Sequence, residues 1–181
     1  MKSGKRRSSI SRRQFIAGSA LTGAAVALGC AGRKNSVYNF LSDDDASTLA
    51  AICDQVIPAD DFPSASQAGV LTYIDRQLTR RYRRHQRTYL GGLKSVDRMS
   101  LDRFGLVPAA ATKQQQLELV TALEKADKKF FELVRAHTME GYYGSPRHGG
   151  NRDAVSWRML GLTEPPLRGR AQADLTNGRQ L

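Results

Sequence analysis

Apolar side chains recur every three or four residues in several stretches between residues 42 and 160, which is the spacing of one helix face. In the first stretch, Ser42 is a good N-cap, and the three aspartates after it suit the positive end of a helix dipole. Pro58 disfavours the helical conformation at the residue before it. The pattern therefore predicts a helix that ends at about Ile57 and buries Leu49, Ile52, Cys53, Val56 and Ile57.

The second stretch predicts a helix that Ser66 or a neighbour caps. Its apolar face is formed by Val70, Leu71, Ile74, Leu78 and Tyr82. Gly91-Gly92 is expected to end this helix or to kink it, because glycine is a common helix terminator. The segment 95–107 has a weaker period and allows a short helix over Val96–Phe104.

Thr112 and Gln115 form the capping-box pattern and predict a further helix with Leu117, Val120, Leu123 and Ala126 on one face. The apolar spacing resumes at Phe130 and runs to Met139. The pattern leaves open whether Lys128-Lys129 separates two helices or lies within one continuous helix. Gly141 is the expected terminator, and Asp153 is expected to cap a short helix that reaches Leu160. No alternating strand pattern of useful length occurs. The prediction is an all-α domain of four to five helices with a structured C-terminal loop rich in glycine and aromatic residues.

The stretch Glu140–Leu160 differs from the rest because it mixes large aromatic residues with four glycines and Pro146. Such aromatic side chains either cover the protein's own core or anchor a partner. We predict a docking surface over Gly141–Trp157, whose backbone is set by Gly149, Gly150 and Asn151 and whose anchors are Tyr142, Tyr143 and Trp157. The competing interpretation is that Trp157 and one tyrosine pack inward.

The N-terminus has the layout of an export signal, with a basic start, an apolar run of about 14 residues and a small-residue end. The run is shorter than the roughly 20 residues of a spanning helix. The segment SRRQFI at Ser11–Ile16 matches the twin-arginine pattern, with Arg12, Arg13 and Phe15 as the signal residues. An ordinary secretory signal is the alternative. The expected organisation is a twin-arginine signal peptide at 1–32, a linker at 33–41, the helical domain at 42–164 and an extended polar tail at 165–181.

The two cysteines predict neither a disulfide framework nor a zinc site. Cys30 follows Leu28-Gly29, as a lipidated cysteine does, but Ala27 stands where a leucine-like residue is usual. Lipidation of Cys30 and ordinary cleavage of the leader therefore both stay open. Cys53 is expected to be buried and inert.

The net charge of +11 would suggest nucleic acid or anionic lipid as a partner. The leader holds six of the 28 basic residues and no acidic one, which leaves 22 basic against 17 acidic residues in the remainder. A second basic run lies at Arg80–Arg87, interleaved with Tyr82 and His85. Because an exported protein does not meet the chromosome, we expect this run to be solvated or to face an acidic partner, and we expect no nucleic acid.

A few side chains are candidate metal ligands or acid–base groups, but none has companions at motif spacing. His137 and Glu140 lie three residues apart, as metal ligands do in some helical bundles, without a second such pair. Asp60 and Asp61 suit a turn, and His148 stands alone in the glycine-rich segment. The sequence therefore predicts no catalytic, cofactor-binding or metal-binding residue.

The string EGYYGSPRHGGNRDAVSWRMLG at residues 140–161 resembles the C-terminal signature of the gluconate 2-dehydrogenase subunit 3 family. The string LSDDDASTLAAICDQVIPADDFPSASQAGVLTYIDRQL at residues 41–78 resembles the family's N-terminal half. The resemblance implies a non-catalytic γ subunit, found in the periplasm and at the membrane through its complex. The implied partners are a large FAD-dependent sugar dehydrogenase, which travels with this chain through the twin-arginine translocase, and a cytochrome c. The alternatives are a stand-alone lipoprotein binding module, based on Cys30, and an exported metal-dependent enzyme.

Overall fold

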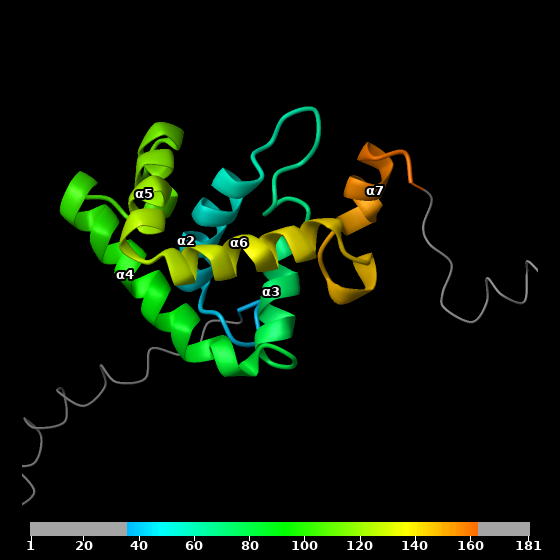
Figure 1. Cartoon of the computed structure of the whole chain (residues 1–181), viewed down its shortest axis with the longest axis horizontal. Helices are drawn as coiled ribbons and strands as arrows, with labels where there is room; N and C mark the ends of the chain where they lie inside the picture. Colours follow the sequence, from blue (N-terminus) through cyan, green and yellow to red (C-terminus); the bar gives the residue numbers. More distant parts are fainter. Residues whose placement is uncertain (1–35, 163–181) are drawn as a thin grey trace, which may run out of the picture. The chain divides into compact units, whose positions relative to one another are not determined.

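The structure is a computed structural model and describes residues 36–162 of the 181-residue chain (Figure 1). These residues form helices and connecting turns and contain no strand, which confirms the all-α prediction. The α-helices are α2 (Asp43–Val56), α3 (Val70–Leu78), α4 (Gln86–Phe104), α5 (Lys113–Ala126), α6 (Lys128–Tyr143) and α7 (Val155–Met159). Short 3-10 turns lie between them: η1 (Arg83–His85), η2 (Pro108–Ala110), η3 (Pro146–His148) and η4 (Arg152–Ala154).

Local capping signals placed several helix ends correctly. The Ser42 hydroxyl accepts from the backbone N–H of Asp45, and α2 ends with Ile57 as its C-cap. Thr112 and Gln115 form the expected capping box at the start of α5. The open question at Lys128-Lys129 is resolved by Asp127, whose carboxylate accepts from the backbone N–H of Phe130 and so starts α6 as a separate helix.

Several expectations for the middle of the chain are wrong. Ser66 does not cap α3, because its N–H and its hydroxyl both donate to the Asp54 carboxylate, and α3 begins after Gly69 in the left-handed conformation (φ 85°). The predicted second helix is in fact two helices, because α3 ends at Leu78 and α4 begins at Gln86, so Tyr82 lies in the turn between them. Helix α4 neither ends nor kinks at Gly91-Gly92, and it includes the segment Val96–Phe104 that was expected as a separate short helix. A Cβ atom at position 92 would lie 2.5 Å from the Phe130 ring, so this glycine makes room for a neighbouring helix.

Two expectations for the C-terminal part are also wrong. Helix α6 continues through Gly141 and ends at Tyr143, with Gly144 as its C-cap. A Cβ at position 141 would lie 2.9 Å from the Tyr73 ring, so Gly141 again serves packing. Asp153 has φ 56° and does not cap α7; the Asn151 side chain accepts from the N–H of Ser156 instead.

Helix α6 is central to the core because it packs against α2, α3, α4 and α5 (Figure 1). Most residues of the predicted apolar faces meet there, but Leu117, Ala126 and Met139 are exposed, and Val56 and Ile57 are only partly buried. Within residues 36–162 no helix is both long and apolar enough to cross a membrane. The fully buried side chains include Leu49, Ile52, Cys53, Ile74, Leu78, Tyr89, Leu93, Val96, Leu119, Leu123, Phe130 and Val134.

Candidate functional site

The segment between α6 and α7 is held in place by one fully buried amide side chain. Asn151 Nδ2 donates to the carbonyl oxygen of Gly144 (2.9 Å), and its Oδ1 accepts from the N–H of Ser156 (2.9 Å). The backbone at Asn151 is left-handed (φ 46°), a conformation that asparagine tolerates better than most residues. Asn151 therefore fixes both the loop and the start of α7. In the sequence, the run Gly149-Gly150-Asn151 is the pattern that indicates a turn here.

The glycines of this loop allow close backbone contact with α6 and α3. A Cβ on Gly150 would lie 2.1 Å from the carbonyl oxygen of Gly141, and one on Gly149 would lie 2.9 Å from the Arg76 guanidinium. The N–H of Arg152 donates to the carbonyl oxygen of Ala68 (2.8 Å), just before α3. The loop is thus a packed part of the domain, as its glycine content indicated.

The three aromatic residues that the sequence offered as anchors have different environments. Tyr142 is 1% exposed and donates its hydroxyl to the Pro63 carbonyl (2.8 Å). Trp157 is 8% exposed and donates Nε1–H to the Tyr143 carbonyl (3.0 Å). The Tyr143 side chain is 37% exposed. Tyr142 and Trp157 therefore pack inward, as the competing interpretation has it, while Tyr143 remains available at the surface; docking through this stretch stays a prediction.

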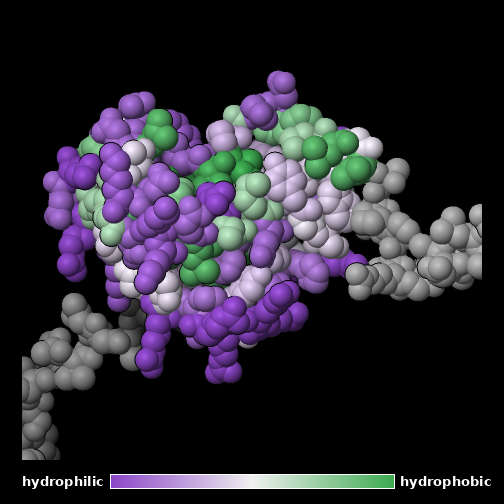
Figure 2. Space-filling view, viewed as in Figure 1, coloured by the Kyte–Doolittle hydropathy of each residue, from purple (hydrophilic) through white to green (hydrophobic). Residues whose placement is uncertain are grey.

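Four exposed apolar side chains belong to the end of α6 and to the residues after α7, and we call them the α6–α7 apolar surface: Met139, Tyr143, Leu160 and Leu162. Met139 and Tyr143 are four residues apart on α6 and therefore share a helix face. Leu160 and Leu162 follow α7, and the N–H of Leu162 donates to the Trp157 carbonyl (2.7 Å). Hydrophobic residues gather over α7 in the space-filling view (Figure 2).

The pair His137 and Glu140, a candidate for metal binding, belongs to an internal network. Glu140 accepts hydrogen bonds from the hydroxyls of Tyr73 (3.0 Å) and Tyr82. The His137 ring stacks on the Tyr82 ring with centroids 4.1 Å apart, and its Nδ1 bonds to the Tyr89 hydroxyl (2.9 Å). Residues 36–162 contain no group of three or more His, Cys, Asp or Glu side chains that could hold a metal ion. The network joins α3, α4 and α6.

The other candidate chemical groups also have ordinary structural environments. Burial raises the pKa of the Cys53 thiol to about 12, which keeps it protonated and unreactive. The Asp60 carboxylate accepts from the N–H of Phe62 (2.8 Å) and so stabilises a turn. Asp61 and His148 are exposed. Cys53 is buried as predicted.

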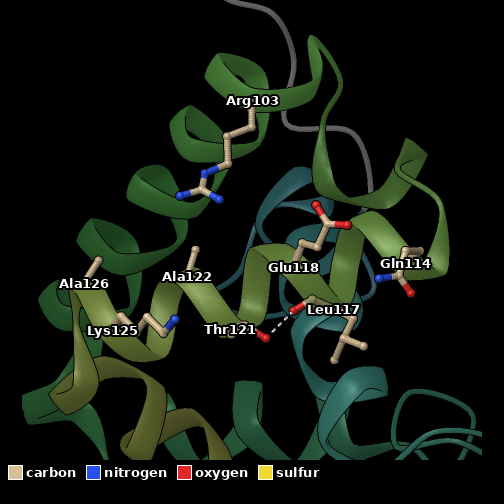
Figure 3. Close-up of a pocket in the computed structure, with 8 residues that line it drawn as sticks. All are labelled: Arg103, Gln114, Leu117, Glu118, Thr121, Ala122, Lys125 and Ala126. Atoms are coloured by element: carbon tan, nitrogen blue, oxygen red, sulfur yellow. Dashed lines mark hydrogen bonds between the residues drawn. The ribbon is translucent and has the colours of Figure 1, made fainter.

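An open groove of about 590 Å³ lies between the end of α4 and α5 (Figure 3). Its lining mixes charged side chains of both signs with apolar surface. The Thr121 hydroxyl donates a hydrogen bond to the Leu117 carbonyl (2.8 Å). This mixture offers a surface for contact rather than a set of reacting groups. The lining residues are Arg103, Gln114, Leu117, Glu118, Thr121, Ala122, Lys125 and Ala126.

Burial of His137 makes the stability of the fold depend on pH. Desolvation lowers its pKa from 6.5 to about 4, so the unfolded chain takes up a proton before the folded chain does as the pH falls. The free energy of unfolding should therefore fall between pH 6.5 and pH 4, by about 3 kcal/mol from this group. Urea unfolding across this range should show a weaker pH dependence in His137→Gln, and an unchanged one in the control His148→Gln. Equal pH dependence in both variants would contradict this assignment.

The signal residues Arg12, Arg13 and Phe15, and Cys30, lie outside the described residues. The sequence model of the twin-arginine translocation pathway signal matches residues 9–29. The chain is therefore exported across the cytoplasmic membrane.

A second sequence model, that of gluconate 2-dehydrogenase subunit 3, matches residues 43–163, which cover almost all of the described part. No curated protein matches the chain. No solved structure matches it either. The match to the family spans the helices α2 to α7 and the packed loop around Asn151. The chain thus belongs to the gluconate 2-dehydrogenase subunit 3 family and carries a twin-arginine export signal.

Proposed function

We propose that this chain is the non-catalytic small subunit of a periplasmic FAD-dependent sugar dehydrogenase, needed for export and stability of the large flavoprotein subunit. The observation that carries the proposal is that one chain combines a twin-arginine signal with a domain of a dehydrogenase-subunit family. Export by this signal would let the large subunit cross the membrane already folded around its flavin. In this role the small subunit acts as a dedicated chaperone for its partner.

The chemistry of the described residues supports a structural role for the helical domain. Three of the candidate acids, bases and nucleophiles form hydrogen bonds inside the chain: Glu140 with two tyrosines, His137 with Tyr89, and Cys53 with Thr138. The contacts of Tyr73, Tyr89 and Thr138 each join two helices. In the proposed complex the large subunit binds the FAD and selects the substrate, which is gluconate, another aldose or a glycoside. A cytochrome c that accepts the electrons would hold the complex at the membrane.

The α6–α7 apolar surface is the part of the domain that we propose to contact the large subunit. Its four side chains are between 37% and 56% exposed, so covering them would remove apolar area from water. Tyr143 is the proposed anchor because tyrosine is enriched among residues that dominate interface energetics. Tyr142 and Trp157 pack behind this surface, and Gly149, Gly150 and Asn151 hold the loop beside it.

Purification of the tagged chain from the exported fraction tests the proposed function. A yellow, flavin-bearing large subunit with sugar dehydrogenase activity should be recovered with it. The isolated chain should show no flavin absorbance, no bound metal and no dehydrogenase activity. A stoichiometric metal in elemental analysis, lost on replacement of His137 or His148, would instead favour the metal-dependent alternative.

A further inference from the structure

Three distant parts of the chain enclose a polar hollow of about 350 Å³ on the surface. The segment before α2 contributes Asn39, and the turn η3 contributes Arg147 and His148. The end of α3 and the turn after it contribute the remaining lining residues: Arg76, Gln77, Thr79 and Arg80. Its volume lies at the lower end of the range of about 300–1,000 Å³ that is typical of small-molecule sites.

Two contacts bring the segments around this hollow together. Gly149 has φ 101°, and a Cβ there would lie 2.9 Å from Arg76 Nη1, so η3 approaches α3 as closely as a glycine allows. On the opposite side, the Asp75 carboxylate accepts from the backbone N–H of Asn39 (2.8 Å) and from its side-chain amide (3.1 Å). These contacts bring the three lining segments together, and the side chains of Arg76, Arg80 and Arg147 are exposed around the hollow.

The hollow concentrates positive charge. The only ion pair within residues 36–162 joins Arg135 and Glu132. No carboxylate in that range therefore forms an ion pair with any of the three arginines that line the hollow. The Nε–H of Arg147 donates to the Ser145 hydroxyl (3.2 Å), so the two terminal nitrogens of this guanidinium can donate to another acceptor. The nearby Asp75 is 1% exposed, and its oxygens already accept from the backbone N–H groups of Asn39, Phe40 and Leu41.

From this geometry we propose that the hollow is a binding site for a phosphate-class oxyanion, held by Arg76, Arg80 and Arg147. Guanidinium groups present paired N–H donors that match the oxygens of a phosphate, and none of these three forms an ion pair with a carboxylate of residues 36–162. The Gln77 amide and the His148 ring can add further hydrogen bonds. Free inorganic phosphate and the headgroup of an anionic phospholipid share this chemistry. The site is independent of the proposed dehydrogenase role.

Thermal unfolding of the full chain tests the site, with phosphate added against chloride at constant ionic strength. The melting temperature should rise by about 4 °C or more and then level off, as expected for a saturable site. The double variant Arg80→Gln, Arg147→Gln should lose this rise. The control Arg83→Gln, Arg87→Gln removes the same charge outside the hollow and should retain it. A rise that does not level off, or an equal loss in both variants, would overturn the proposal.

Vesicle flotation distinguishes the two sources of the oxyanion. Phosphatidylglycerol vesicles should bind the chain more than tenfold better than phosphatidylcholine vesicles if the source is a headgroup, and only the hollow variant should lose this binding. A saturable phosphate effect without vesicle binding assigns the site to free phosphate. If gluconate stabilises the chain and phosphate does not, the phosphate assignment is wrong. Loss of the large subunit in the hollow variant, with no effect of phosphate or vesicles, would also overturn it and make the hollow a protein contact.

Discussion

Replacement of Arg12 and Arg13 together by lysine is expected to leave both this chain and its flavoprotein partner in the cytoplasm. The signal SRRQFI depends on the arginine pair, and lysine keeps the charge while it removes the guanidinium groups. Under the proposed function the large subunit has no route of its own, so its exported activity should fall to background. Cell fractionation, with detection of both chains and of dehydrogenase activity in each fraction, measures this result.

A nearby arginine pair provides the matched control for the export experiment. Arg6 and Arg7 lie in the same basic region but outside SRRQFI, so their replacement by lysine should leave export unchanged. Normal exported flavoprotein in the Arg12, Arg13 variant would refute the carrier role. Normal export of this chain in that variant would also refute the twin-arginine route.

The second large effect is expected at Trp157. Truncation to alanine removes a side chain that is 8% exposed and the hydrogen bond that ties α7 to the end of α6. The free energy of unfolding should fall by about 3–5 kcal/mol, as for other large-to-small changes in a core. Tyr143→Ala should lower the urea midpoint much less than Trp157→Ala, because this residue is 37% exposed against 8%, but should lower affinity for the large subunit by about 2 kcal/mol or more.

Tyr142→Phe is the control that separates ring packing from hydrogen bonding. It keeps the buried ring and removes the hydroxyl that donates to the Pro63 carbonyl, so a loss of about 1–3 kcal/mol is expected. The docking hypothesis fails if folded Tyr143→Ala protein recovers as much large subunit as the wild type. The inward assignment of Trp157 fails if its alanine variant unfolds at the wild-type urea concentration.

The starts of α2 and α5 could be predicted because they depend on neighbours in the sequence. Ser42 with Asp45, and Thr112 with Gln115, satisfy the first amides of their helices within one turn of chain. The predictions at Gly91-Gly92 and Gly141 were wrong for the opposite reason. Gly92 and Gly141 lie within helices where the rings of Phe130 and Tyr73 occupy the space that a side chain would fill, and that contact is set by tertiary packing.

The aromatic residues of the C-terminal stretch could be singled out but not assigned from the sequence. Whether a tyrosine packs inward depends on a distant acceptor: the Tyr142 hydroxyl meets the carbonyl of Pro63, 79 residues away. The polar hollow was missed for a similar reason. Arg80 stood out in a basic run, but the glycine-rich turn that brings Arg147 towards it is far along the chain.

The contact between Gly92 and Phe130 restricts how related sequences can differ. The Phe130 ring fills the place of a side chain on α4, so α4 and α6 lie closer together there than two larger residues would permit. An alanine at position 92 would need a smaller residue at position 130, or a shift of one helix along the other. These two positions should therefore change together among relatives, and Gly92→Ala should be tolerated better when it is combined with Phe130→Leu than when it is made alone.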